Sequence, residues 1–377
     1  MLAILLVGMT CCITGEAEAV TTVAHAPMAN CRSAILMEAT TGKILFEQNA
    51  DEALPPASVT KIMTLLLVME ALESGMLKYD DVLSASAYAC SMGGSQIYLK
   101  EGEQMSVEDL IKSVVIASAN DAAVVLAEAI SGSEEAFVEQ MNAKAKELGM
   151  KNTNFENTNG LDDTAKNHVT SARDIAIMSR ELIAHEKILE FSSIWMDTIR
   201  NGEFGLTNTN RLVRFYKGAT GLKTGSTAKA GFCISATASR DGMNLICVIM
   251  GADSRDIRNA AATSLLDWGF ANYTYYDGGT PYTGELPIRG GTQRICRVAS
   301  EPVKALAEKN TVAQIKANIE LPNTLEAPIE KGQRIGTVTY SVNGEVIAKS
   351  EIFAVESISK ISFLDIWLRI VKSMLTN

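Results

Sequence analysis

The sequence predicts an α+β protein in which an antiparallel sheet is flanked by helices and interrupted by a long helical insert. A small all-β domain and a short amphipathic helix are expected to follow. Three observations support this. A chain of 377 residues with 47% hydrophobic residues is too long for one ordinary domain. Strand patterns lie on both sides of a helical stretch at about 80–190. A segment rich in Gly, Pro and Thr, Tyr276–Pro287, separates a further run of strand patterns.

The first elements are a hairpin and a buried helix. The apolar runs 33–37 and 43–46 flank Thr40-Thr41-Gly42, which is a turn signal. Two prolines at 55 and 56 then end the extended chain, and a helix is expected from Ser58 to Ser74. This helix is apolar on almost every side, so it should be buried, and Gly75 is expected to cap its C-terminus.

The helical insert and the returning strands complete the first domain, which we place at 20–280. Further helices are predicted at 106–115, 121–130, 134–148 and 171–183, the first of them beginning with a cap-like Ser106. Strands follow at 221–227, 231–237 and 245–250, and a helix at 255–270 closes the domain. A sheet with helices packed against it is the simplest arrangement of these elements.

The C-terminal part is predicted to be a small β-sandwich domain at 285–357 and a helix at 360–377. Strands at 335–340 and 346–355 are joined by the turn Asn343-Gly344. In the last segment the polar residues fall on one face and apolar residues cover the rest. This pattern favours a helix that lies in a membrane interface, although a helix docked on the β domain or on a dimer partner would show it too. The polar face consists of Asp365, Arg369, Lys372 and Thr376.

The N-terminus and the charge indicate an exported protein. Residues 2–14 are apolar and Ala17-Glu18-Ala19 is a cleavage pattern, so residues 1–19 are predicted to be a signal peptide; an uncleaved membrane anchor is the alternative. The mature chain then has 34 basic and 42 acidic residues, a net charge of about −8, which disfavours binding to nucleic acid. Its five cysteines match no zinc pattern and are expected to be free thiols.

Three short motifs, in order, carry the chemistry. They are Ser58-Val59-Thr60-Lys61, Ser118-Ala119-Asn120 and Lys223-Thr224-Gly225. Each is weak alone, since Ser-x-x-Lys recurs at 226–229 and 357–360 and Ser-x-Asn at 341–343; only Lys-Thr-Gly occurs once. Their context is informative, because the first opens a buried helix, the second lies between two helices and the third lies in a strand. Together they indicate a site for acyl transfer.

The residue types suggest a role for each group. Ser58 is the candidate nucleophile, and Lys61 can accept its proton if burial, the helix N-terminus and the charge of Lys223 keep the amine neutral. The backbone N–H groups of Ser58 and Ser226 are the candidate oxyanion donors. The remaining candidates are Ser118 as a proton relay to the leaving amine, Asn120 as a holder of Lys61 and the substrate amide, Lys223 and Thr224 as binders of a substrate carboxylate, and Gly225 as the point where a ligand backbone approaches.

The motifs and their surroundings resemble the low-molecular-weight penicillin-binding proteins, the serine-type D-alanyl-D-alanine carboxypeptidases of peptidase family S11. The likeness extends over the chain from about Arg32 and includes Pro55-Pro56-Ala57-Ser58, Gly93-Gly94-Ser95, Asn159-Gly160-Leu161-Asp162 and Gly221–Gly225. The resemblance implies a penicillin-binding, serine β-lactamase-like catalytic domain. It also implies removal of the terminal D-Ala from peptidoglycan pentapeptide stems through an acyl-enzyme on Ser58, acylation by β-lactam antibiotics, and a C-terminal amphipathic anchor. Neither a cofactor nor a metal is expected.

Two features of the motif regions depart from the family's pattern, and three other functions are compatible with the motifs. Ser226 stands where some relatives have His, so its oxyanion role would be carried by the backbone alone. Glu156 and Asn159 lack the spacing of a class A β-lactamase deacylation motif, which predicts slow release of bound penicillin. A DD-endopeptidase, a β-lactamase and a non-catalytic penicillin-binding scaffold share the motifs. The intact set of six polar motif residues is evidence against the scaffold.

Three further features have structural interpretations. His168 is expected to be a local hydrogen-bond partner and not a catalyst. Arg211 and Arg214 are candidates for sensing substrate carboxylates, although a solvated surface position is the simpler interpretation. The segment Met92–Ser95, which contains two glycines, is expected to edge the cleft as a gating loop.

Overall fold

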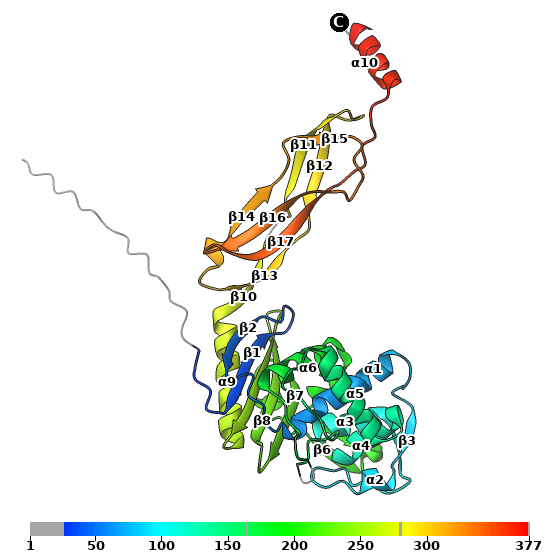
Figure 1. Ribbon diagram of the computed structural model, residues 1–377, viewed down its shortest axis with the longest axis vertical. Coiled ribbons are helices and arrows are strands. Elements are labelled where there is room, and N and C mark those ends of the chain that lie inside the picture. Colours follow the sequence, from blue (N-terminus) through cyan, green and yellow to red (C-terminus); the bar gives the residue numbers. More distant parts are fainter. Residues whose placement is uncertain (1–25, 163–164, 279–280, 376–377) are drawn as a thin grey trace, which may run out of the picture.

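The computed structural model describes residues 26–162, 165–278 and 281–375, and Figure 1 shows three parts in succession. A sheet with helices on both faces is followed by an elongated β domain, and a short helix projects from the far end of that domain. The predicted α+β architecture is therefore confirmed. The predicted signal peptide, residues 1–19, lies outside the described residues.

The central sheet has five antiparallel strands in the order β2-β1-β9-β8-β7. The predicted hairpin forms, and so does the turn between β8 and β9. Because β7 is an edge strand, one side of the strand that contains Lys-Thr-Gly is open to the helical insert. The strand bounds are β1 (Ser33–Glu38), β2 (Ile44–Gln48), β7 (Ala219–Thr227), β8 (Gly231–Arg240) and β9 (Met243–Ala252).

Each face of the sheet has its own hydrophobic core, because successive side chains of a strand point to opposite faces. On one face Leu36 and Ile234 pack with Leu265 and Phe270 of α9 (Arg255–Asn272). On the other face Ile35 and neighbouring strand residues pack with the helical insert. The motif residues lie where the insert meets the edge strand.

The insert surrounds α1 (Lys61–Glu73), whose side chains are almost all buried as the sequence predicted. The other predicted helices of the insert form within one residue of their expected bounds. The sequence did not indicate the short strands or short helices of the insert. The exception is the turn η1, which lies within the helix predicted from Ser58. The elements are η1 (Ala57–Thr60), β3 (Val82–Ser84), α2 (Ala87–Cys90), β4 (Gln104–Ser106), α3 (Val107–Ile116), α4 (Asn120–Ser131), α5 (Glu134–Glu147), α6 (Ala172–Ala184), α7 (Lys187–Ser192), β5 (Met196–Ile199), η2 (Arg200–Gly202), β6 (Phe204–Thr207) and α8 (Leu212–Phe215).

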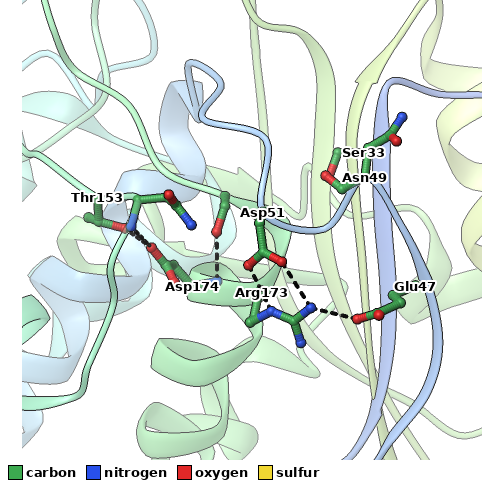
Figure 2. Close-up of polar contacts among 9 residues, drawn as sticks. Ser33, Glu47, Asn49, Asp51, Thr153, Arg173 and Asp174 are labelled. Atoms are coloured by element: carbon green, nitrogen blue, oxygen red, sulfur yellow. Dashed lines mark hydrogen bonds and ion pairs between the residues drawn. The ribbon is translucent and has the colours of Figure 1, made fainter.

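The N-terminus of α6 ties the insert to the chain that leads to the first motif, as Figure 2 shows. The Arg173 guanidinium donates to Asp51 at 2.8 Å and to Glu47 at 2.6 Å. The neighbouring Asp174 accepts from the Thr153 hydroxyl at 2.8 Å and from a backbone N–H one residue earlier. Two adjacent residues of α6 therefore hold the end of β2 and the turn that follows it, and also the segment that follows α5.

The second domain is built on a six-stranded sheet in the order β14-β16-β17-β12-β11-β15, with its own core around Val338 and Ile352. A separate pair joins it to the first domain, because β10 directly follows α9 and pairs with β13. The elements are β10 (Tyr273–Asp277), β11 (Thr283–Arg289), β12 (Ile295–Ser300), β13 (Lys304–Glu308), η3 (Val312–Gln314), β14 (Lys316–Glu320), β15 (Leu325–Glu326), β16 (Arg334–Val342) and β17 (Glu345–Ala354). The predicted turn Asn343-Gly344 joins β16 to β17, both residues at positive φ.

The C-terminal helix α10 (Phe363–Leu375) points away from the β domain (Figure 1). Its apolar side chains are exposed, with Phe363 at 83% and Trp367 at 55%. The alternative of a helix docked on the β domain is therefore wrong for this structure. In the described parts of the chain, no helix combines the length and the apolar character needed to cross a bilayer.

Candidate active site

The nucleophile candidate lies in a tight turn ahead of α1. Ala57 has a φ of +48°, and residues 57–60 form the 3₁₀ turn η1, so the α-helix begins at Lys61 and not at Ser58 as predicted. Positive φ is costly for a residue with a Cβ, and such strain persists only where the surroundings impose it. The turn leaves Ser58 half-buried and brings Lys61 beneath it.

Lys61 is fully buried and has three polar partners. Its Nζ lies 3.0 Å from Oγ of Ser58, 2.5 Å from Oδ1 of Asn120 and 2.9 Å from the carbonyl oxygen of Asn159. The Asn120 amide is oriented by its other end, since its Nδ2 donates to the Gly93 carbonyl at 2.7 Å. The first two motifs therefore meet at one amine.

Ser118 and Asn120 come from the junction between α3 and α4. Ser118 has a φ of +63° and is almost fully buried, and Asn120 is the first residue of α4. The Asn120 N–H donates to the Ser95 carbonyl at 2.7 Å, so the loop predicted to gate the cleft is tied to the second motif at Gly93 and at Ser95. Asp121 accepts from the N–H groups of Ile97 and Leu99 and fixes the next part of that loop.

The third motif lies on β7, facing the other two. The buried Lys223 Nζ donates to Ser118 Oγ at 2.9 Å and to the Thr224 carbonyl at 2.8 Å. Gly225 is in close contact with the nucleophile turn, because a Cβ there would lie 2.7 Å from the Ser58 nitrogen and 2.9 Å from the Pro56 oxygen. Glycine is therefore required at position 225 for β7 to approach Ser58. This requirement adds to the predicted one, which was the close approach of a ligand backbone.

Burial sets the protonation of both lysines. Desolvation lowers the pKa of Lys61 well below its usual value; the charge of Lys223 lowers it further, and Asp121 acts in the opposite direction. Burial also lowers the pKa of Lys223 to about 7, with a contribution from Arg258. Two of the three predicted influences on Lys61, burial and the second cation, therefore operate in the structure.

A cavity of about 600 Å³ opens over these groups. The hydroxyl-bearing residues Ser58, Ser118 and Thr224 line it, and so do the aromatic residues Trp195 and Phe215. Neither lysine lines the cavity, but the buried amines of Lys61 and Lys223 contact two of its lining hydroxyl groups, those of Ser58 and Ser118. All eight residues predicted for the site lie in or directly under this cavity: Ser58, Lys61, Ser118, Asn120, Lys223, Thr224, Gly225 and Ser226.

Comparison with known proteins agrees with this geometry. Residues 20–254 match the model of the peptidase S11 family, described as D-alanyl-D-alanine carboxypeptidase, and residues 270–360 match that of the penicillin-binding protein 5 C-terminal domain. The chain belongs to the S11 family. Over 340 residues it is 44% identical to the D-alanyl-D-alanine carboxypeptidase DacF of Bacillus subtilis, covering 88% of this chain and 87% of that one.

Solved structures show the same S11 architecture. Penicillin-binding protein 5 from Haemophilus influenzae aligns with a TM-score of 0.75 and 32% identity, covering 89% of this chain and all of that one. The ampicillin-bound form of penicillin-binding protein D2 from Listeria monocytogenes aligns with a TM-score of 0.59 and 34% identity, covering 64% of this chain and 98% of that one. The fold and the order of its two domains are therefore those of this S11 group.

Sequence reasoning missed several residues of this S11 site. The Asn159 carbonyl, Thr209 and Arg258 were not assigned roles, although Thr224 donates to Thr209 at 2.8 Å and Arg258 lines the cavity. Arg258 could have been found, because it lies on the α9 face that carries Ala261, Ala262 and Leu265. A charged residue on a buried helix face is a signal of function.

Arg258 is a buried cation that has no ion-pair partner among the residues that the structure describes. It is 3% exposed, and its guanidinium donates to the Cys233 carbonyl at 3.3 Å and to the side chain of Asn259. Across the described ranges, no carboxylate lies within 4 Å of it. Burial lowers its pKa to about 10, so it remains charged at neutral pH.

The structure also places the other residues that the sequence analysis interpreted. His168 is a local hydrogen-bond partner as predicted. Arg211 lines the cavity, whereas the Arg214 guanidinium stacks on Trp195 and on Phe215. The cysteines are free, as expected: Cys31, Cys90, Cys233, Cys247 and Cys296.

Proposed function

We propose that this chain removes the terminal D-Ala from peptidoglycan pentapeptide stems through an acyl-enzyme on Ser58, with Lys61 as the base. The observation that carries the proposal is the 3.0 Å contact between Ser58 Oγ and a fully buried lysine amine whose pKa is strongly lowered. Membership of the carboxypeptidase family supplies the reaction and its substrate class.

The three partners of Lys61 determine the orientation of its N–H groups and lone pair when the amine is neutral. A neutral amine has two N–H donors and one lone pair, and two of its three partners are carbonyl oxygens that can only accept. The two N–H groups therefore point to Asn120 and Asn159. The lone pair then faces Ser58, whose hydroxyl donates its proton to Lys61 as Oγ attacks the carbonyl carbon of the penultimate D-Ala.

The charge that develops on the substrate carbonyl oxygen needs donors already in place. The N–H of Ser58 and the N–H of Ser226 are the proposed pair, with Ser226 lining the cavity near Ser58. The close approach of Gly225 to the Ser58 nitrogen supports this, because it brings β7 against the nucleophile turn. No side chain of Ser226 is needed for this role.

The leaving group requires a proton and a site for its carboxylate. We assign the proton transfer to Ser118: its hydroxyl gives a proton to the departing nitrogen as the peptide C–N bond breaks, and takes one from the ammonium group of Lys223, 2.9 Å away. Thr224 and the unpaired Arg258 line the same cavity and supply a hydroxyl and a cation for the carboxylate. Water then hydrolyses the ester and releases the shortened peptide.

With β-lactams the leaving group stays attached, and release depends on an activated water. The carboxylate of Glu156 accepts from the N–H groups of Lys166 and Asn167, so it is engaged away from Ser58. We therefore expect a persistent adduct with penicillins. This argues against the β-lactamase alternative.

The tail supports a location at a membrane surface. The exposed apolar side chains of α10 suit an interfacial position, which would hold the enzyme on the outer face of the cytoplasmic membrane, beside the cell wall. Flotation with anionic liposomes tests this, comparing the mature full-length chain with a chain ended at residue 359. Equal flotation of the two proteins would remove the anchor from the proposal.

One assay tests the activity. The tail-less protein is incubated with diacetyl-Lys-D-Ala-D-Ala and the release of D-Ala is measured. We expect release that is abolished in Ser58→Ala and reduced but measurable in Ser118→Ala, and mass spectrometry should place a penicillin adduct on Ser58. Penicillin labelling without D-Ala release would favour a scaffold or an endopeptidase, and an adduct on any other residue would overturn the mechanism.

A further inference from the structure

The peptide bond between Ala57 and Ser58 has a feature that its catalytic role does not explain. Its N–H belongs to Ser58 and is the proposed oxyanion donor, and in the described chain no hydrogen bond occupies it. Its carbonyl belongs to Ala57 and accepts from Oγ1 of Thr60 at 2.8 Å. Because the peptide is trans and planar, the carbonyl and the N–H point in opposite directions. A hydrogen bond that fixes the Ala57 carbonyl therefore also fixes the direction of the Ser58 N–H.

A second bond extends this contact to His168. Oγ1 of Thr60 lies 2.8 Å from Nε2 of His168, and Nδ1 of the same ring accepts from the Glu156 N–H at 3.0 Å. A ring nitrogen that accepts carries no proton, so the neutral imidazole has its hydrogen on Nε2. The bonds therefore run in one direction, from His168 to the Thr60 hydroxyl and from that hydroxyl to the Ala57 carbonyl.

The relay is shielded from water. Thr60 is 0% exposed and His168 is 7% exposed, and burial lowers the pKa of His168 to about 4, which keeps it neutral at ordinary pH. Gly160 closes the remaining side, because a Cβ there would lie 1.9 Å from the Ala57 oxygen and 2.8 Å from Oγ1 of Thr60. No water can take the place of the Thr60 hydroxyl without displacing this loop.

We propose that Thr60 and His168 are positioning residues that aim and polarise the Ala57–Ser58 peptide so that its N–H stabilises the oxyanion. A hydrogen bond to a peptide carbonyl draws electron density toward the oxygen and makes the N–H a stronger donor, and successive bonds reinforce one another. The relay also offsets the strain of the positive φ at Ala57. The inference rests on the proposed function, in which Ser58 supplies both the nucleophile and one oxyanion donor.

A pair of substitutions at Thr60 separates this role from packing. Thr60→Val keeps the shape and removes the hydroxyl, whereas Thr60→Ser keeps the hydroxyl and removes a methyl group. If the relay operates, Thr60→Val lowers the acylation rate constant for a penicillin about five- to tenfold, the effect of one neutral hydrogen bond. Thr60→Ser retains most of the rate, and both variants keep the noncovalent dissociation constant within about twofold. A residue that only fills space gives the reverse order, with Ser worse than Val.

The acyl-enzyme gives a direct signal. In infrared difference spectra with a carbonyl-labelled penicillin, weaker donation to the ester carbonyl raises its stretching frequency. We expect that rise in Thr60→Val and not in Thr60→Ser. If Thr60→Val does not fold, His168→Leu and His168→Gln replace the pair, since the Gln amide can still donate to Thr60 and Leu cannot.

The outcomes are distinct. An unchanged acylation rate and carbonyl frequency in Thr60→Val, or an equal loss in Thr60→Ser, would overturn the relay while leaving Ser58 as the nucleophile. Absence of a Ser58 adduct in the wild-type protein would instead overturn the proposed function. The native melting temperature of each variant confirms that the comparison is made between folded proteins.

Discussion

Replacing Asn120 by Asp tests whether Lys61 must be neutral. The substitution preserves the size of the side chain and places a negative charge where Oδ1 now lies, 2.5 Å from the Lys61 amine. A nearby opposite charge favours the protonated amine and so removes the base. The Asn120→Ala variant is the matched control, because it loses the contact without adding charge.

The distance gives the size of the effect. Two unit charges 2.5 Å apart attract by about 7 kcal/mol at an effective dielectric constant of about 20. If two-thirds of this is lost to the cost of burying a new carboxylate, about 2 kcal/mol remains. Since about 1.4 kcal/mol corresponds to a factor of ten, the ratio of neutral to protonated Lys61 at a given pH falls on the order of 30-fold or more.

The assay is the acylation rate constant for a penicillin as a function of pH. In Asn120→Asp we expect the rise of the rate with pH to shift to more alkaline solution, because the variant Lys61 loses its proton only at higher pH. In Asn120→Ala the rate falls, but the midpoint of the ascending limb of the profile stays in place. An Asn120→Asp profile with the wild-type midpoint would refute the assignment of Lys61 as a neutral base.

Three further predictions follow from single contacts. Arg258→Met should raise KM for a peptide with a free C-terminal carboxylate about tenfold or more. For the same peptide with an amide at its C-terminus, the slow turnover should be unchanged. Equal effects on both peptides would exclude binding of the carboxylate by Arg258. Gly225→Ala should lower both the stability of the fold and kcat for D-Ala release, the latter about 100-fold, because the added methyl would lie 2.7 Å from the Ser58 nitrogen and 2.9 Å from the Pro56 oxygen, so β7 and the nucleophile turn must move apart. A wild-type kcat would show that β7 can shift freely. His168 has a folded pKa of about 4 against 6.5 unfolded, so the unfolded chain binds the extra proton and stability is lost as pH falls from about 6.5 to 4. In urea unfolding, His168→Gln should therefore narrow the difference in stability between pH 7 and pH 4.5 by about 2 to 3 kcal/mol, and an unchanged difference would contradict this.

Local patterns predicted most of the first domain and its site. The hairpin before Ser58, the helices of the insert and the three returning strands form where periodicity, caps and turns placed them. The three motifs converge because the first two stand at the start of predictable helices and the third lies within a predictable strand. Asn120 begins a helix and Lys223 lies in a strand, so a fold that packs the insert against the sheet edge brings them together.

The features that could not be predicted depend on contacts between segments distant in sequence. The 3₁₀ turn at Ala57 replaces the expected first helical turn, because Gly160 and Gly225 press on it from two other segments and Thr60 bonds its carbonyl. The short strands of the second domain lack strong alternation, and their pairing is set by tertiary packing. The secondary-structure propensities of single residues do not predict the 3₁₀ turn or the strand pairing.

The same distinction explains which functional residues the sequence revealed. Residues that bear the reaction stand in motifs, since a nucleophile and its base must be neighbours on one turn. Residues that act on those groups from outside the motifs lie far away in sequence: Arg258 is 35 residues from Lys223, whose pKa it lowers, and His168 is 108 residues from Thr60, its hydrogen-bond partner. Burial selects them, because a charged or polar side chain inside a core persists only where a partner or a function compensates its desolvation. A search for polar residues on predicted buried helix faces would have found Arg258, but only the folded structure shows that Thr60 connects His168 to the peptide bond of the nucleophile.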